Sequence, residues 1–156
     1  MGSQLLLASR SPQRRAILEQ LGVEFDVAVP DVEELEEGDP RALALENALR
    51  KARAAAPPRT RATVLGVDTV VSSGGRVLGK PRDERQAHSF LSELSDRAHE
   101  VHSGLALIGP DGERTEGALT RVRFRRLAQS EIDWYLAGGE WRERAGGYAI
   151  QGRGAA

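Results

Sequence analysis

The first part of the chain has the hydrophobic pattern of a strand, a tight turn and a helix. The apolar residues 5–8 (LLLA) predict a short buried strand. Ser11 is a good helix N-cap, and Pro12 suits the first helical position because its missing N–H would have no partner there. The helix is expected to end at Gly22. Its apolar side is expected to face a core through Ala16, Ile17, Leu18 and Leu21.

A strand, a helix and a second strand are expected next. Residues 23–29 predict a strand that leads into an acidic segment. A helix is expected to start at Pro40, with Asp39 as its cap, and to stop where Pro57-Pro58 breaks it. Residues 63–71 (TVLGVDTVV) then predict a strand.

The second half combines hairpins with two further helices. Gly74-Gly75 is typical of a hairpin turn, with residues 76–78 as the return strand. Asp83 can cap a third helix. The remaining expected elements are a strand over 101–108, a turn over 109–112, a strand over 121–125, and a helix that Ser130 caps and that runs through Leu136 to Gly138-Gly139.

Strands and helices intermix with hairpins along the whole sequence. This order predicts an α/β fold with a mixed β-sheet. The chain has 156 residues, of which 40% are hydrophobic, and this is enough for one core. We find no repeat and no low-complexity linker, so residues 1–156 are expected to form a single domain.

Composition narrows the class of protein. The absence of cysteine excludes disulfides and cysteine-based metal sites, and it favours a reducing compartment. No apolar stretch approaches the roughly 18 residues that span a bilayer, so we expect a cytoplasmic protein without a membrane segment. Lys+Arg 22 against Asp+Glu 23 leaves no basic surplus, and aromatic residues make up only 4%. Both observations oppose a nucleic-acid-binding module.

Asp68 is the strongest anomaly in the sequence. It interrupts an apolar run, and the period of a strand puts it on the same face as Val64 and Val70. An ionised carboxylate in that position is costly unless it is paired or bound to a metal. The alternative is a carboxylate at a strand end that accepts a backbone hydrogen bond in a turn.

Several cationic residues could meet an anion. Arg14 and Arg15 lie in the first turn of a predicted helix, where an incoming phosphate would relieve their conflict with the helix dipole. Lys51 shares a helix face with Asn47, and Lys80 follows the predicted return strand. The alternative for each of these residues is a side chain in water.

A metal site is less defined by the residues alone. Glu34 belongs to the acidic run 31–37, and a hard cation needs oxygen ligands of this kind. An acidic run is also typical of a solvated loop, and the sequence alone does not choose among its carboxylates. The histidines lack metal-ligand spacing and are assigned no role: His88, His99 and His102.

Taken together, a set of ordered blocks resembles the Maf family of nucleoside triphosphate pyrophosphatases from Leu5 to Ala155. The blocks are LLLASRSPQRRAILEQLGV, DVEE, ALRKA, VLGVDTVV with GKP, LSELSDRAHEVHSG and AGGYAIQG. The resemblance implies hydrolysis of the α–β phosphoanhydride with Mg²⁺ or Mn²⁺. It also implies a bent mixed sheet flanked by helices, in a two-lobed fold with a central cleft like that of inosine triphosphatases, and often a homodimer.

The resemblance also implies a set of site residues. Asp68, Lys51 and Lys80 would be catalytic, Glu34 and Asp68 would bind the metal, and the substrate would contact Ser9, Arg14, Thr69 and Gln151. Thr69 and Gln151 look like the branch acting on dTTP and UTP, whereas Gln13 stands where that branch commonly has arginine. Family chains usually continue into a strand, a Gly-Leu-Pro segment and a helix beyond the point where this sequence stops.

The leading interpretation is therefore a house-cleaning pyrophosphatase for dTTP, UTP and modified pyrimidine nucleotides. One alternative is a pyrophosphatase for 7-methyl-GTP or other non-canonical nucleotides. Another is a nucleotide-binding regulator of septum formation and cell division without efficient turnover.

Overall fold

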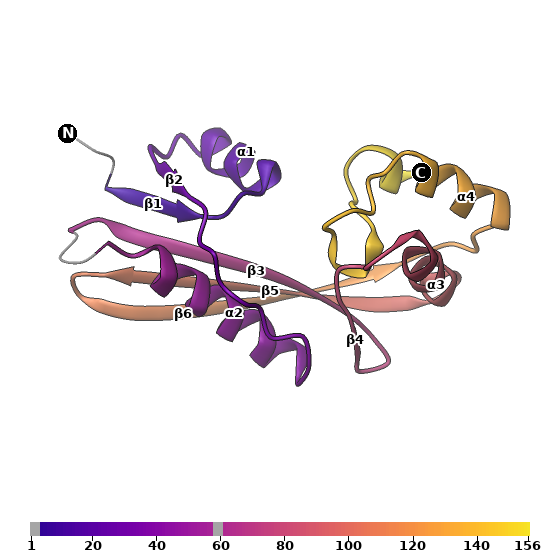
Figure 1. The fold of residues 1–156 in the computed structure, drawn as a ribbon, viewed down its shortest axis with the longest axis horizontal. Helices are drawn as coiled ribbons and strands as arrows, with labels where there is room; N and C mark the ends of the chain where they lie inside the picture. Colours follow the sequence, from indigo (N-terminus) through magenta and orange to yellow (C-terminus); the bar gives the residue numbers. More distant parts are fainter. Residues whose placement is uncertain (1–3, 58–60) are drawn as a thin grey trace. The chain divides into compact units, whose positions relative to one another are not determined.

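The computed structural model describes residues 4–57 and 61–156, and in them a mixed six-stranded sheet is flanked by four α-helices (Figure 1). The strands are β1 Leu5–Ala8, β2 Asp26–Ala28, β3 Thr63–Ser73, β4 Arg76–Leu78, β5 Ala98–Gly109 and β6 Gly112–Arg123. The helices are α1 Pro12–Gln20, α2 Pro40–Ala55, α3 Glu84–Leu94 and α4 Gln129–Ala137. The strand order is β2-β1-β3-β5-β6, and β4 pairs with β3.

The chain forms two compact units. The first consists of the residues up to Leu35, with Arg41–Asp68 and Ser103–Ala118. The second consists of Glu36–Pro40, Thr69–His102 and Leu119–Ala156. Strand β3 passes from the first unit to the second between Asp68 and Thr69. The assignment of the whole chain to one functional domain stays a prediction.

In the first unit, α2 packs directly on the backbone of the sheet. Strand β1 lies parallel to both β2 and β3, and Ala8 pairs with Gly66. A Cβ atom on Gly66 would lie 2.0 Å from the carbonyl oxygen of Ala48, and one on Gly104 would lie 2.2 Å from that of Ala44. Only glycine allows such a close approach of helix and strand. The buried core here is made of Ala8, Ala48, Ala52, Val64 and Ala106.

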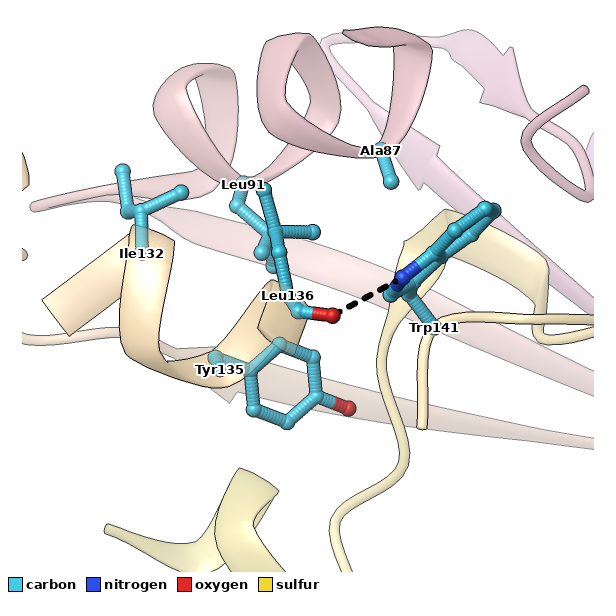
Figure 2. Packing of buried hydrophobic residues seen from close by; sticks show 6 residues of the cluster. All are labelled: Ala87, Leu91, Ile132, Tyr135, Leu136 and Trp141. Atoms are coloured by element: carbon cyan, nitrogen blue, oxygen red, sulfur yellow. Dashed lines mark hydrogen bonds between the residues drawn. The ribbon is translucent and has the colours of Figure 1, made fainter. Parts of the chain in front are cut away.

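In the second unit, α3 and α4 pack against each other (Figure 1). Figure 2 shows their shared cluster, which contains Ala87, Leu91, Ile132, Tyr135, Leu136 and Trp141. The indole Nε1–H of Trp141 donates a hydrogen bond to the carbonyl oxygen of Leu136 at 3.1 Å, so its one polar atom is satisfied inside the cluster. A second cluster joins β3 and β4 to α3 through Val71, Leu78, Phe90 and Leu94.

Most predicted elements are confirmed where the pattern was strong. Strand β1 and the return strand β4 have the predicted bounds, and β4 pairs antiparallel with β3. Helix α1 starts at Pro12, and α2 starts at Pro40. Asp83 caps α3, since its side chain accepts a hydrogen bond from the backbone N–H of Gln86 at 2.8 Å. Helix α2 ends at Ala55, and Pro58 lies outside the described residues.

The predicted core face of α1 is wrong. No residue of the helix is buried, and Ile17 and Leu21 are 55% and 69% exposed. A helical period identifies an apolar face, but it carries no information about whether another element covers that face.

Several boundaries differ from the prediction, since β3 extends to Ser73 and β5 begins at Ala98. Strand β2 is limited to Asp26–Ala28 within the expected 23–29. Strand β6 covers Gly112–Arg123 instead of the expected 121–125. The pattern did not predict its first part, because that part is exposed and polar and lacks the alternation of a half-buried strand. Ser130 lies inside α4 rather than at its cap. Instead, the Glu131 carboxylate accepts a hydrogen bond from the backbone N–H of Ala128 at 2.7 Å.

None of the described helices is both long and apolar enough to cross a membrane.

Candidate active site

Asp68 is a buried carboxylate held by two side chains of one helix. It lies in β3 and is only 4% exposed. Its Oδ1 atom accepts a hydrogen bond from Lys51 Nζ at 2.8 Å, and its Oδ2 atom accepts one from Asn47 Nδ2 at 3.3 Å. Asn47 and Lys51 are four residues apart in α2, so both project from the same face. The charge that looked costly in the sequence is therefore paired.

Lys51 is shared between two carboxylates of the first unit. Its Nζ atom lies 3.0 Å from Glu34 Oε1 and 2.8 Å from Asp68 Oδ1, and it also donates to the carbonyl oxygen of Val67 at 3.4 Å. The Lys51 side chain is only 12% exposed, so water screens these contacts weakly. The Lys51 ammonium thus brings together two carboxylates, one from the acidic run before α2 and one from β3.

Asn47 fixes the acidic segment that carries Glu34. Its Oδ1 accepts from the backbone N–H of Leu35 at 2.8 Å, and its Nδ2 donates to the carbonyl oxygen of Leu35 at 2.9 Å. This pinned residue follows Glu34 directly, so Glu34 is the carboxylate of the acidic run that reaches Lys51. Asn47 has no role among the predicted site residues. Its position one helical turn before Lys51 did not single it out, because a helical asparagine often points to water.

Ser9 and Arg14 form a second group, in the turn between β1 and α1. Ser9 is 5% exposed, and its Oγ accepts hydrogen bonds from Arg14 Nη1 at 2.9 Å and from the backbone N–H of Ser11 at 3.2 Å. The pairing of Ala8 with Gly66 places this turn next to the part of β3 that leads to Asp68. Ser11 makes no side-chain cap and donates to Gln13 Oε1 instead. Because the guanidinium of Arg14 donates to Ser9, it points back toward the residues before α1.

The other three predicted site residues belong to the second unit. Thr69 directly follows Asp68 in β3. Lys80 follows Gly79, whose carbonyl oxygen accepts a hydrogen bond from the backbone N–H of Gly146 at 3.1 Å. Gln151 is exposed and lies at the end of the glycine-rich segment 145–152. Among the predicted site residues, direct contacts join Lys51 to Glu34 and Asp68, and Arg14 to Ser9.

The acidic pair matches one kind of metal site. The described residues contain no group of three or more His, Asp or Glu side chains arranged to hold a metal by themselves. Mg²⁺, however, is usually bound through one or two carboxylates together with waters and substrate phosphates. Glu34 and Asp68, both within hydrogen-bond distance of Lys51 Nζ, supply two such oxygens. The residues fit a cation that arrives with a phosphate ligand.

Fold and site together define a class. The start of a helix that follows a parallel strand is a common phosphate-binding position in α/β proteins, and Ser9 and Arg14 lie at such a position here. The family of Maf-like proteins matches residues 4–156, and the chain belongs to this family.

Several relatives with 40–47% identity to this chain have the same name, dTTP/UTP pyrophosphatase. The chain is 46% identical over 155 residues to a dTTP/UTP pyrophosphatase of Symbiobacterium thermophilum, and the match covers 98% of this chain and 80% of that protein. It is 47% identical over 153 residues to the dTTP/UTP pyrophosphatase of Novosphingobium aromaticivorans, covering 96% and 76%. It is 40% identical over 156 residues to that of Pyrococcus furiosus, covering 97% and 80%.

Proposed function

We propose that this chain is a nucleoside triphosphate pyrophosphatase that hydrolyses dTTP and UTP to the monophosphate and pyrophosphate. The contacts of Lys51 with Glu34 and Asp68 carry the proposal, because an ammonium within hydrogen-bond distance of two carboxylates supports a site for a phosphate, a cation and an attacking water. Membership of the Maf family and the names of its relatives support the reaction and the choice of pyrimidine nucleotides.

Asp68 is the proposed general base. Its carboxylate accepts a proton from a water molecule while the water oxygen attacks the α-phosphorus. The bond from the α-phosphorus to the bridging oxygen breaks, and pyrophosphate leaves with the bonding electrons. Lys51, 2.8 Å from Asp68, is the proposed partner of the negative charge that builds on the phosphoryl oxygens.

Glu34 and Asp68 are the proposed holders of a divalent cation, Mg²⁺ or Mn²⁺, together with phosphate oxygens. When bound, this cation would neutralise phosphate charge and polarise the attacked phosphoryl group. The contact of Lys51 Nζ with both carboxylates supports this assignment, since it shows that the two can share one positive charge.

Ser9, Arg14 and Lys80 are the proposed contacts of the triphosphate, and Thr69 and Gln151 those of the nucleoside. A glutamine amide offers a donor and an acceptor, which matches the edge of a pyrimidine.

A single catalytic domain over residues 1–156, the central cleft, a homodimer and a cytoplasmic location remain predictions.

Product analysis with purified protein tests the proposal. We expect dTTP and UTP to yield monophosphate and pyrophosphate only with Mg²⁺ or Mn²⁺, and faster than GTP or 7-methyl-GTP. Asp68→Asn should lower kcat by about a hundredfold or more, because it removes the base. Asp111→Asn, in the exposed turn between β5 and β6, is the matched control and should keep full activity. A folded protein that binds nucleotide without turnover would instead favour the regulatory alternative.

A further inference from the structure

The glycine-rich segment 145–152 is held tightly against β3 and the residue after β4. Gly146 has a φ of 72°, and a Cβ atom there would lie 2.9 Å from Val71 Cγ1. The backbone N–H of Gly146 donates to the carbonyl oxygen of Gly79, the residue before Lys80. The start of the segment therefore has little freedom to move.

Tyr148 anchors the middle of this segment. Its hydroxyl lies 2.6 Å from Nε2 of His99, which belongs to β5. Its ring makes edge contacts with Phe124 at 4.8 Å and with His99 at 5.4 Å between centroids. The next residue, Ala149, donates its backbone N–H to the hydroxyl of Tyr135 at 2.9 Å. Two successive residues are thus fixed through tyrosine hydroxyl groups, just before Gln151.

His99 is placed in a way that packing alone does not explain. It is 2% exposed, and its Nδ1 atom has no hydrogen-bond partner within the described part of the chain. Burial lowers the pKa of His99, and burial raises the pKa of Tyr148 to about 12, so the pair is neutral near pH 7. A buried imidazole with one unsatisfied nitrogen is costly. Within the described residues, the ring of His99 makes its polar contact with Tyr148.

We propose that His99 and Tyr148 are positioning residues for base recognition. Their hydrogen bond fixes the segment that leads to Gln151, so that the Gln151 amide is presented in one conformation to the pyrimidine. This inference rests on the proposed function, because it assigns the pair to the same nucleoside contact. A segment that is already ordered loses less conformational freedom on binding. Loss of the His99–Tyr148 hydrogen bond should therefore change substrate affinity and base preference. It should leave the chemical step unchanged, because Asp68 and Lys51 are held by their own contacts in the first unit.

Kinetics of a double-mutant cycle test the coupling between Tyr148 and Gln151. Tyr148→Phe keeps the ring and removes the hydroxyl. It should raise KM for dTTP and UTP by roughly threefold to tenfold and change kcat by less than about twofold, as expected for one lost hydrogen bond. In a Gln151→Ala background, Tyr148→Phe should add almost nothing to KM. Ser95→Ala is the control, since it removes a hydrogen bond to the backbone N–H of Leu127 in the same unit and should leave KM unchanged.

Hydrogen exchange without substrate supplies a second readout. In Tyr148→Phe, the amides of Gly146 and Ala149 should exchange roughly tenfold faster, as local opening becomes easier. Ser95→Ala should leave both amides unchanged. Unchanged exchange in Tyr148→Phe would overturn the proposal, and so would KM effects that add fully to those of Gln151→Ala. If the wild-type protein neither binds nor hydrolyses dTTP or UTP, the proposed function and the base-recognition role both fail. The exchange data would then still decide whether the pair fixes the segment.

Discussion

At the scale of single residues, the site depends on one ammonium between two carboxylates. Lys51→Met keeps the length of the side chain but leaves Glu34 and Asp68 without their shared cation. We expect kcat/KM for dTTP to fall by about a hundredfold or more, since a charge that stabilises the transition state is lost. The variant should also lose about 3 kcal/mol of unfolding free energy, because Asp68 remains buried without its ion-pair partner. Steady-state kinetics and urea unfolding measure the two effects. Arg53→Met, on the exposed side of α2, is the control and should retain activity.

Asn47 gives a second prediction at this scale. Asn47→Ala removes the bonds to Leu35 and the bond to Asp68 together. The acidic segment then loses its attachment to α2, so kcat/KM should fall at least tenfold, with a loss of about 2 kcal/mol in stability. Kinetics and urea unfolding are compared with Glu46→Ala, which removes only an exposed ion pair with Arg50. Equal behaviour of the two variants would contradict a role for Asn47 in the site.

The sequence was informative about Asp68 and uninformative about Asn47 for a physical reason. A charge inside an apolar run conflicts with burial, so the conflict is visible without any structure. An asparagine inside a helix conflicts with nothing, because such a side chain often points to water. Its importance arises only when the helix is docked and its amide meets the backbone of Leu35. The choice of Glu34 depends on that same docking.

At the scale of elements, the position of α2 decides the geometry of Asn47 and Lys51. Gly66→Ala would place a Cβ atom 2.0 Å from the carbonyl oxygen of Ala48, so the helix must move away from β3. We expect a loss of roughly 3 kcal/mol or more and a parallel loss of activity, since overpacking displaces backbone. Gly117→Ala meets no atom closer than 3.5 Å and serves as the control for urea unfolding and kinetics. Wild-type stability of Gly66→Ala would contradict the close packing.

Elements with strong local signals could be predicted from the sequence, and those that depend on neighbours could not. The cap at Asp83 and the glycine hairpin before β4 are local chemistry, and both are confirmed. The exposed apolar side of α1 and the polar first part of β6 depend on what covers them. Periodicity reports the faces of an element and leaves its partners undetermined.

At the scale of the whole molecule, buried His99 links global stability to pH. Burial lowers its pKa below the ordinary 6.5, so the unfolded chain binds a proton at a higher pH than the folded protein does. The free energy of unfolding should therefore fall as the pH falls through 6.5 toward the folded pKa of His99. Glu131 affects stability only at lower pH. The hydrogen bonds that it accepts from Arg125 and from the backbone of Ala128 lower its pKa from 4.5 to about 2.

Urea unfolding at pH 7.5, 6.5 and 5.5 measures this dependence. His99→Gln should be less stable than the wild type at pH 7.5, since the contact with Tyr148 is altered, but its stability should change less between pH 7.5 and 5.5. An equal slope in the wild type and in His99→Gln would mean that another group titrates in this range, and that the folded state accepts a charged His99 without cost.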